Sequence, residues 1–77
     1  MGKEDAAARI GEVEARVTAF QRKVPATPTA EDHVYRARQY LAVARRLLAG
    51  GNALAARLIT DEADDLVTLA NGRAVNR

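Results

Sequence analysis

The sequence predicts an all-α protein, an antiparallel three-helix bundle that forms alone or as part of an oligomer. Two observations lead to this prediction. Apolar side chains recur every three or four residues in three separate stretches, which is the period of a helix with one buried face. Proline or glycine, which interrupt helices, separates the stretches. Because a chain of 77 residues supports only one hydrophobic core, residues 1–77 are expected to form a single domain.

The first helix is expected over about residues 5–24. Asp5 precedes Arg9, and Glu12 precedes Arg16, by four residues, an order that favours ion pairs on an exposed helix surface. The apolar positions follow the spacing of a heptad seam, which suits either a helix of a single-chain bundle or a coiled coil between chains. These positions are Ala6, Ile10, Val13, Val17, Phe20 and Val24.

The second helix is expected over about residues 29–49. Pro25 and Pro28 end the preceding helix, because each removes a backbone donor and disfavours helical geometry in the residue before it. Either Thr27 or Thr29 is placed to cap the new helix. A broad apolar stripe then faces the core: Val34, Ala37, Tyr40, Leu41, Ala44, Leu47 and Leu48.

The third helix is expected over about residues 53–70. Gly50-Gly51 forms a tight turn before it, and Asn52 is placed to cap it. Asn71-Gly72 is predicted to end it, which leaves residues 73–77 as a flexible tail. Its apolar arc is wide enough to contact two neighbours: Ala55, Ala56, Leu58, Ile59, Ala63, Leu66, Val67, Leu69 and Ala70.

Residues 40–63 resemble a single tetratricopeptide-type helical hairpin. Tyr40 stands where that repeat has a large aromatic residue, and Ala44 stands at its close-packed small position. The chain departs from the repeat at Thr60 and Thr68 and holds no second copy. The resemblance implies close antiparallel packing of the second and third helices, and binding of a peptide or helix in a groove. The other matching residues are Leu47, Gly51, Ala56 and Ala63.

The side chains available for chemistry do not predict an enzyme. Cysteine and serine are absent, and the single histidine, His33, lies in the first turn of the second helix. No nucleophile, base and orienting group can be assembled, and no glycine-rich phosphate loop is present, so neither catalytic residues nor a cofactor are expected. Four of the threonines are expected to be caps or helix-surface residues: Thr27, Thr29, Thr60 and Thr68.

Four acidic residues lie close together in the third helix and raise the question of a metal site: Asp61, Glu62, Asp64 and Asp65. Magnesium and calcium need several convergent oxygen ligands, and dimetal bundle sites add a histidine motif that this chain lacks. Ion pairs between helices explain the cluster more simply. The hairpin is predicted to bring Asp65 near Arg38. It is predicted to bring Asp61 or Glu62 near Arg45, and no metal is expected.

The expected function is that of a non-catalytic helical protein–protein interaction module, either an adaptor, a small chaperone, an inhibitor or an assembly subunit. Its surface for a protein partner or for homo-oligomerisation is predicted to be Ile10, Val13, Val17, Phe20, Ile59 and Leu66. The rival interpretation is that these residues close the core of a monomer. The alternative function is a small nucleic-acid-binding regulator, although a net charge of +2 is low for this role. Its contacts would be Arg36, Arg38, Arg45 and Arg46.

The chain is expected to be cytoplasmic and not to enter a membrane. It has no cysteine for disulfide bonds, which suits a reducing compartment. Its apolar runs are far shorter than the roughly 20 residues of a membrane-spanning helix. Acidic residues follow Met1 closely, and no hydrophobic block comes next, so the N-terminus does not have the pattern of a signal peptide.

Overall fold

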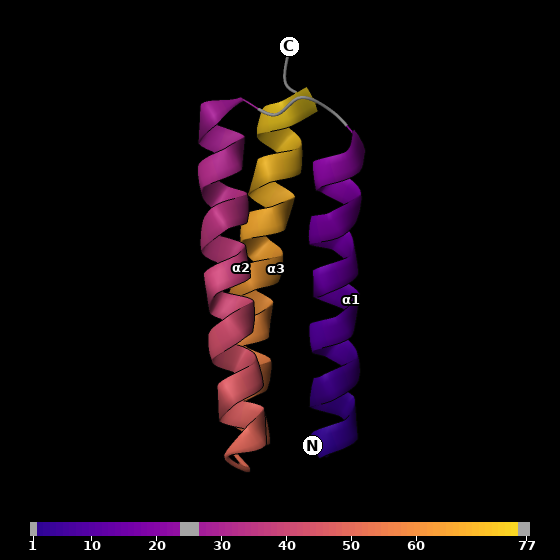
Figure 1. The fold of residues 1–77 in the computed structure, drawn as a ribbon, viewed down its shortest axis with the longest axis vertical. Helices are drawn as coiled ribbons and strands as arrows, with labels where there is room; N and C mark the ends of the chain where they lie inside the picture. Colours follow the sequence, from indigo (N-terminus) through magenta and orange to yellow (C-terminus); the bar gives the residue numbers. More distant parts are fainter. Residues whose placement is uncertain (1, 24–26, 76–77) are drawn as a thin grey trace.

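The computed structural model describes residues 2–23 and 27–75, which form three helices lying side by side (Figure 1). Helix α1 spans Lys3–Lys23, α2 spans Pro28–Ala49 and α3 spans Ala53–Val75. Each helix runs antiparallel to the one before it, so α1 and α3 point in the same direction (Figure 1). The predicted all-α three-helix bundle is therefore confirmed.

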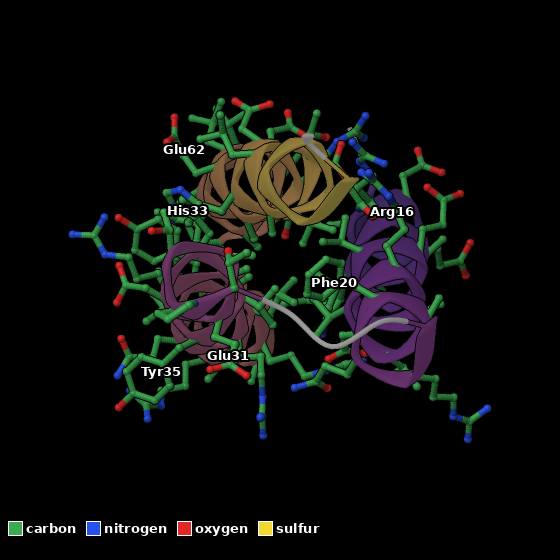
Figure 2. The ribbon with its side chains drawn as sticks, turned by 90° about the horizontal axis from the view of Figure 1, so that it is seen from above. Arg16, Phe20, Glu31, His33, Tyr35 and Glu62 are labelled. Carbon is green, nitrogen blue, oxygen red and sulfur yellow. The ribbon has the colours of Figure 1, made fainter. Side chains whose placement is uncertain are left out.

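The apolar seam of α1 faces the inside of the bundle. Ile10 and Val13 are fully buried, and Phe20 points into the space between the helices (Figure 2). Val24 lies outside the described residues. The seam thus closes the core of this one chain, as the monomer interpretation expects. The buried apolar residues are Ala6, Ile10, Val13, Val17, Phe20, Ala30, Val34, Ala37, Leu41, Ala44, Leu48, Ala56, Ala63, Val67 and Ala70.

Thr27 caps α2. Its hydroxyl Oγ1 accepts a hydrogen bond of 3.1 Å from the backbone N–H of Ala30. Pro28 occupies the first turn, where its missing N–H would have no partner within the helix anyway. Of the two capping threonines predicted from the sequence, the structure therefore uses the first.

A tight turn joins α2 to α3, as predicted. The N–H of Asn52 donates to the Leu47 carbonyl at 2.9 Å, and the N–H of Gly51 donates to the Leu48 carbonyl at 3.0 Å. This is the hydrogen-bond pattern of a Schellman motif, and Gly51 adopts the left-handed φ of 88° that the motif needs. The Asn52 side-chain Oδ1 then accepts from the N–H of Ala55 at 3.1 Å and caps α3.

Helix α3 extends beyond its predicted end. It continues to Val75, so the prediction that Asn71-Gly72 ends it was wrong. The Asn71 side chain donates back to the Val67 carbonyl at 3.1 Å within the helix, and one glycine in a helix costs only about 1 kcal/mol. Residues 73–75, predicted as part of a flexible tail, are helical, and residues 76–77 lie outside the described residues.

Small side chains form the buried stripe of α3. Val67 is its largest apolar member, and Thr60, predicted as a cap or surface residue, is fully buried instead. The Thr60 hydroxyl donates to the Ala56 carbonyl at 2.7 Å, which satisfies it inside the core. Alanines on the facing side of α2 let the two backbones approach closely. The hairpin of α2 and α3 is therefore closely packed.

Candidate interaction surface

The large apolar side chains of α3 lie mostly outside the core. Leu54 is 60% exposed, Leu58 59% and Leu69 49%. The prediction that Leu58 and Leu69 belong to a core-facing arc was wrong. The heptad positions of α3 that carry small residues pack against the rest of the bundle, and these leucines consequently lie on the opposite side.

On α2, three apolar residues lie on the flank away from α1. Tyr40 and Val43 are exposed, while Leu47 is partly buried against the core. Arg45 marks the α1 side of α2, because it contacts Glu14 of α1. At 100° per residue, the three apolar residues lie roughly 140–160° around the helix from Arg45.

On α3, three leucines lie on the flank away from α1. Asp64 marks the α1 side, since it contacts arginines of α1. Leu58 and Leu69 lie about 120–140° around the helix from Asp64, and Leu66 lies about 160° from it. We call the surface formed by the two flanks the outer apolar face. Its residues are Tyr40, Val43 and Leu47 of α2 and Leu58, Leu66 and Leu69 of α3.

Two charged residues lie within the outer apolar face, Glu62 on α3 and Arg36 on α2. Glu62 lies on the side of the bundle away from α1, as does the half-buried His33 of α2 (Figure 2). Arg36 lies between Tyr40 and Val43 in angle on α2. Glu62 and Arg36 are both exposed, and within the described part of the chain neither takes part in an ion pair. One acidic and one basic side chain on a largely apolar surface can thus form ion pairs with a partner.

The acidic cluster of α3 pairs mainly with α1. Arg9 Nη2 lies 3.0 Å from Asp64 Oδ2, and Arg9 Nε lies 3.4 Å from Asp61 Oδ1. Arg16 contacts Asp64 as well, where α1 meets α3 (Figure 2). Arg57, one turn before Asp61 on the same helix, adds a contact of 3.7 Å. The predicted ion pairing of this cluster is present, but its interhelical partners were assigned to the wrong helix.

Arg45 also has a different partner from the predicted one. It forms two hydrogen bonds with Glu14 of α1, at 2.7 and 2.6 Å, instead of pairing with Asp61 or Glu62. The hydrogen bonds and the negative charge of Glu14 raise the pKa of Arg45. Arg38 forms no ion pair with Asp65 among the described residues. Both arginines line a groove of about 390 Å³ between α1 and α2, so they face away from α3.

The four arginines proposed as nucleic-acid contacts do not form one surface. Arg38 and Arg45 lie at the groove between α1 and α2. Arg36 lies on the outer apolar face, and Arg46 is about 80° from it around the helix. Phosphate contacts along a duplex or single strand require basic side chains on a continuous surface. The structure places these four on different sides of α2.

The predicted partner surface is placed largely inside the chain. Ile10, Val13, Val17 and Phe20 are buried, and both Ile59 and Leu66 are half-buried against the core. Leu66 alone of the predicted residues lies on the outer apolar face. The prediction missed five members of this face: Tyr40, Val43, Leu47, Leu58 and Leu69. The sequence held a signal only for the two that belong to α3. In α3 the small residues, not the leucines, continue the strict three-four spacing.

Residues suited to chemistry are dispersed. His33 is half-buried, and its Nδ1 is buried without a hydrogen-bond partner. Among residues 2–23 and 27–75, no three His, Cys, Asp or Glu side chains lie together as a metal-ion site would require. None of the helices in this part of the chain is both long enough and apolar enough to cross a membrane.

Comparison with known proteins gives no family assignment. No protein-family model matches the chain, and neither a curated protein nor a solved structure matches it significantly. The resemblance to a tetratricopeptide hairpin therefore stays a prediction.

Proposed function

We propose that this chain is a non-catalytic helical protein–protein interaction module that binds its partner through the outer apolar face. The observation that carries the proposal is the exposure of Leu58 and Leu69, at 59% and 49%, beside the exposed Tyr40 and Val43. Single exposed apolar residues are common on soluble proteins, whereas several gathered on one side are typical of a contact surface.

The size of the hydrophobic contribution supports this role. Burying a fully exposed leucine contributes about 1.5–3 kcal/mol, so Leu58 and Leu69 together contribute on the order of 2–3 kcal/mol at their observed exposure. Tyr40 adds an amphipathic ring of the kind enriched at binding hot spots. Part of this gain offsets the entropy lost on association, so the face suits a moderate affinity.

Affinity capture with matched variants tests the proposal. The double variant Leu58→Glu/Leu69→Glu places two charges on the outer apolar face. The control Ala8→Glu/Ala19→Glu places the same two charges at exposed positions of α1. Captures from cells of the native host are compared, after circular dichroism has established that all three proteins are helical.

Wild type and control are expected to retain the same specific proteins, and the leucine variant is expected to lose them. An identical captured set for all three proteins would contradict a role for this face.

A further inference from the structure

We infer that the partner on the outer apolar face is a second copy of this chain. The inference rests on the proposed function and names the occupant of that surface. In the resulting two-fold dimer, α3 of each copy lies over α2 of the other. The central four helices are then α2 and α3 from both copies, and the α1 helices lie outside them.

Charge complementarity is the first reason. Glu62 belongs to α3 and Arg36 to α2, both are exposed, and neither has an ion-pair partner among the described residues. A symmetric interface makes each contact twice, because the same patch is used on both copies. When α3 lies over α2 of the other copy, the helix that carries Glu62 faces the helix that carries Arg36 in both halves of the dimer. The patch is therefore complementary to itself.

The same charges disfavour the other symmetric arrangement. If α3 lay over α3 of the second copy, the helix that carries Glu62 in one chain would face the helix that carries Glu62 in the other. Like charges brought together at an interface lose their hydration and repel each other. If α3 lies over α2 of the other copy instead, these helices run antiparallel, as neighbouring helices do in an up-down bundle.

The dimensions of the molecule allow such an interface. The bundle measures 41 × 16 × 15 Å, and a standard interface buries roughly 800 Å² of accessible surface on each partner. Those 800 Å² are about one-sixth of the 4927 Å² accessible surface of the chain. A second copy can therefore cover the whole face.

Sedimentation equilibrium over a range of concentrations tests the dimer directly. Wild type and the control Ala8→Glu/Ala19→Glu are expected to approach twice the chain mass of 8.3 kDa. Leu58→Glu/Leu69→Glu is expected to remain at the monomer mass. Wild type that is monomeric up to millimolar concentration, or a leucine variant that dimerises as well as wild type, would overturn the inference.

Charge reversal tests the arrangement of the helices. Glu62→Arg and Arg36→Glu are each expected to weaken dimerisation about tenfold or more, because each places like charges across the interface. The double variant Glu62→Arg/Arg36→Glu is expected to restore it, and Arg22→Glu on α1 is expected to leave it unchanged. Single variants that dimerise like wild type would overturn the arrangement of α3 over α2.

The two proposals fail in different ways. A monomeric wild type that still captures proteins through Leu58 and Leu69 overturns the dimer and leaves the interaction module in place. A monomeric wild type whose captured proteins do not depend on the leucines overturns both.

Discussion

Arg45 of α2 and Glu14 of α1 form a bidentate ion pair, which is joined by two hydrogen bonds. Arg45 Nε donates to Glu14 Oε2 at 2.7 Å, and Nη2 donates to Oε1 at 2.6 Å. Because both groups are planar, a guanidinium and a carboxylate can form two parallel hydrogen bonds. Two such bonds restrict the relative position of α1 and α2 more than a single contact does. The contact joins α1 to α2 on the side of the bundle away from the α3 acids.

Removal of the Glu14 charge is expected to destabilise the fold modestly. Both side chains are about half exposed, so Glu14→Gln should lower the free energy of unfolding by about 0.5–1 kcal/mol. Urea denaturation measures the difference, and a double-mutant cycle with Arg45→Gln isolates the pair. The coupling should shrink in 0.5 M salt, since salt screens exposed charges. A coupling of zero at low salt would show that the contact adds nothing to stability.

The pH dependence of this pair follows from the direction of the Arg45 shift. Glu14 raises the pKa of Arg45 in the folded state above its unfolded value. Such a group stabilises the fold at every pH below its unfolded pKa, and the contribution is lost only as pH rises through the folded pKa. The difference between wild type and Arg45→Gln should therefore stay constant from pH 7 to about pH 10. Urea titrations at these pH values measure it, and a steady decline of that difference would contradict the assignment.

Asp64 is expected to matter more than its neighbour Asp65. Its side chain is only 19% exposed and contacts both Arg9 and Arg16. Asp64→Asn should lower the free energy of unfolding by about 1–3 kcal/mol, because two charged donors lose a charged acceptor. Asp65→Asn, on the exposed surface, should change it by less than about 0.5 kcal/mol. Equal effects of the two changes in urea denaturation would contradict the ion-pair network.

Truncation of a core residue of α1 should destabilise the fold far more than truncation of an exposed leucine of α3. Ile10 is fully buried, so Ile10→Ala should cost about 2–5 kcal/mol through lost burial and a residual cavity. Leu54 is 60% exposed and outside the outer apolar face, so Leu54→Ala should cost less than about 0.5 kcal/mol. Thermal melting followed by circular dichroism compares the two. A larger loss of stability from Leu54→Ala than from Ile10→Ala would mean that the leucine side of α3 faces the core.

The turn between α2 and α3 offers a matched pair of glycines. Gly51 has a φ of 88°, so Gly51→Ala should cost about 1–2 kcal/mol from backbone strain. At Gly50 an added Cβ would lie 3.5 Å from the Arg46 carbonyl oxygen, an ordinary contact. Gly50→Ala should therefore leave the free energy of unfolding unchanged or raise it by up to about 1 kcal/mol. Guanidinium denaturation of both variants checks this, and equal losses would rule out the left-handed turn.

The sequence predicted well those features that depend on local hydrogen bonding. Thr27, Asn52 and the Gly50-Gly51 turn bond to backbone groups within a few residues, so their roles could be inferred from the residues beside them. The end of α3 was not predictable in this way. Asn71-Gly72 suits a helix end and a helix interior almost equally, and the difference is only about 1 kcal/mol per glycine.

The sequence by itself determined that three amphipathic helices form and where α2 and α3 begin, because periodicity and caps act over one or two helical turns. Only the tertiary structure decided which side of α3 is buried and which helix neutralises its acids. Helix α3 carries leucines on one side and alanines, Thr60 and Val67 on the other, and both sides are apolar enough to face a core. The alanine side permits the closest approach to α2. With that side buried, Leu58 and Leu69 lie outside the core and Asp64 contacts Arg9 and Arg16. The rotation of α3 about its own axis is therefore set by contacts between helices, which the pattern within one helix does not contain.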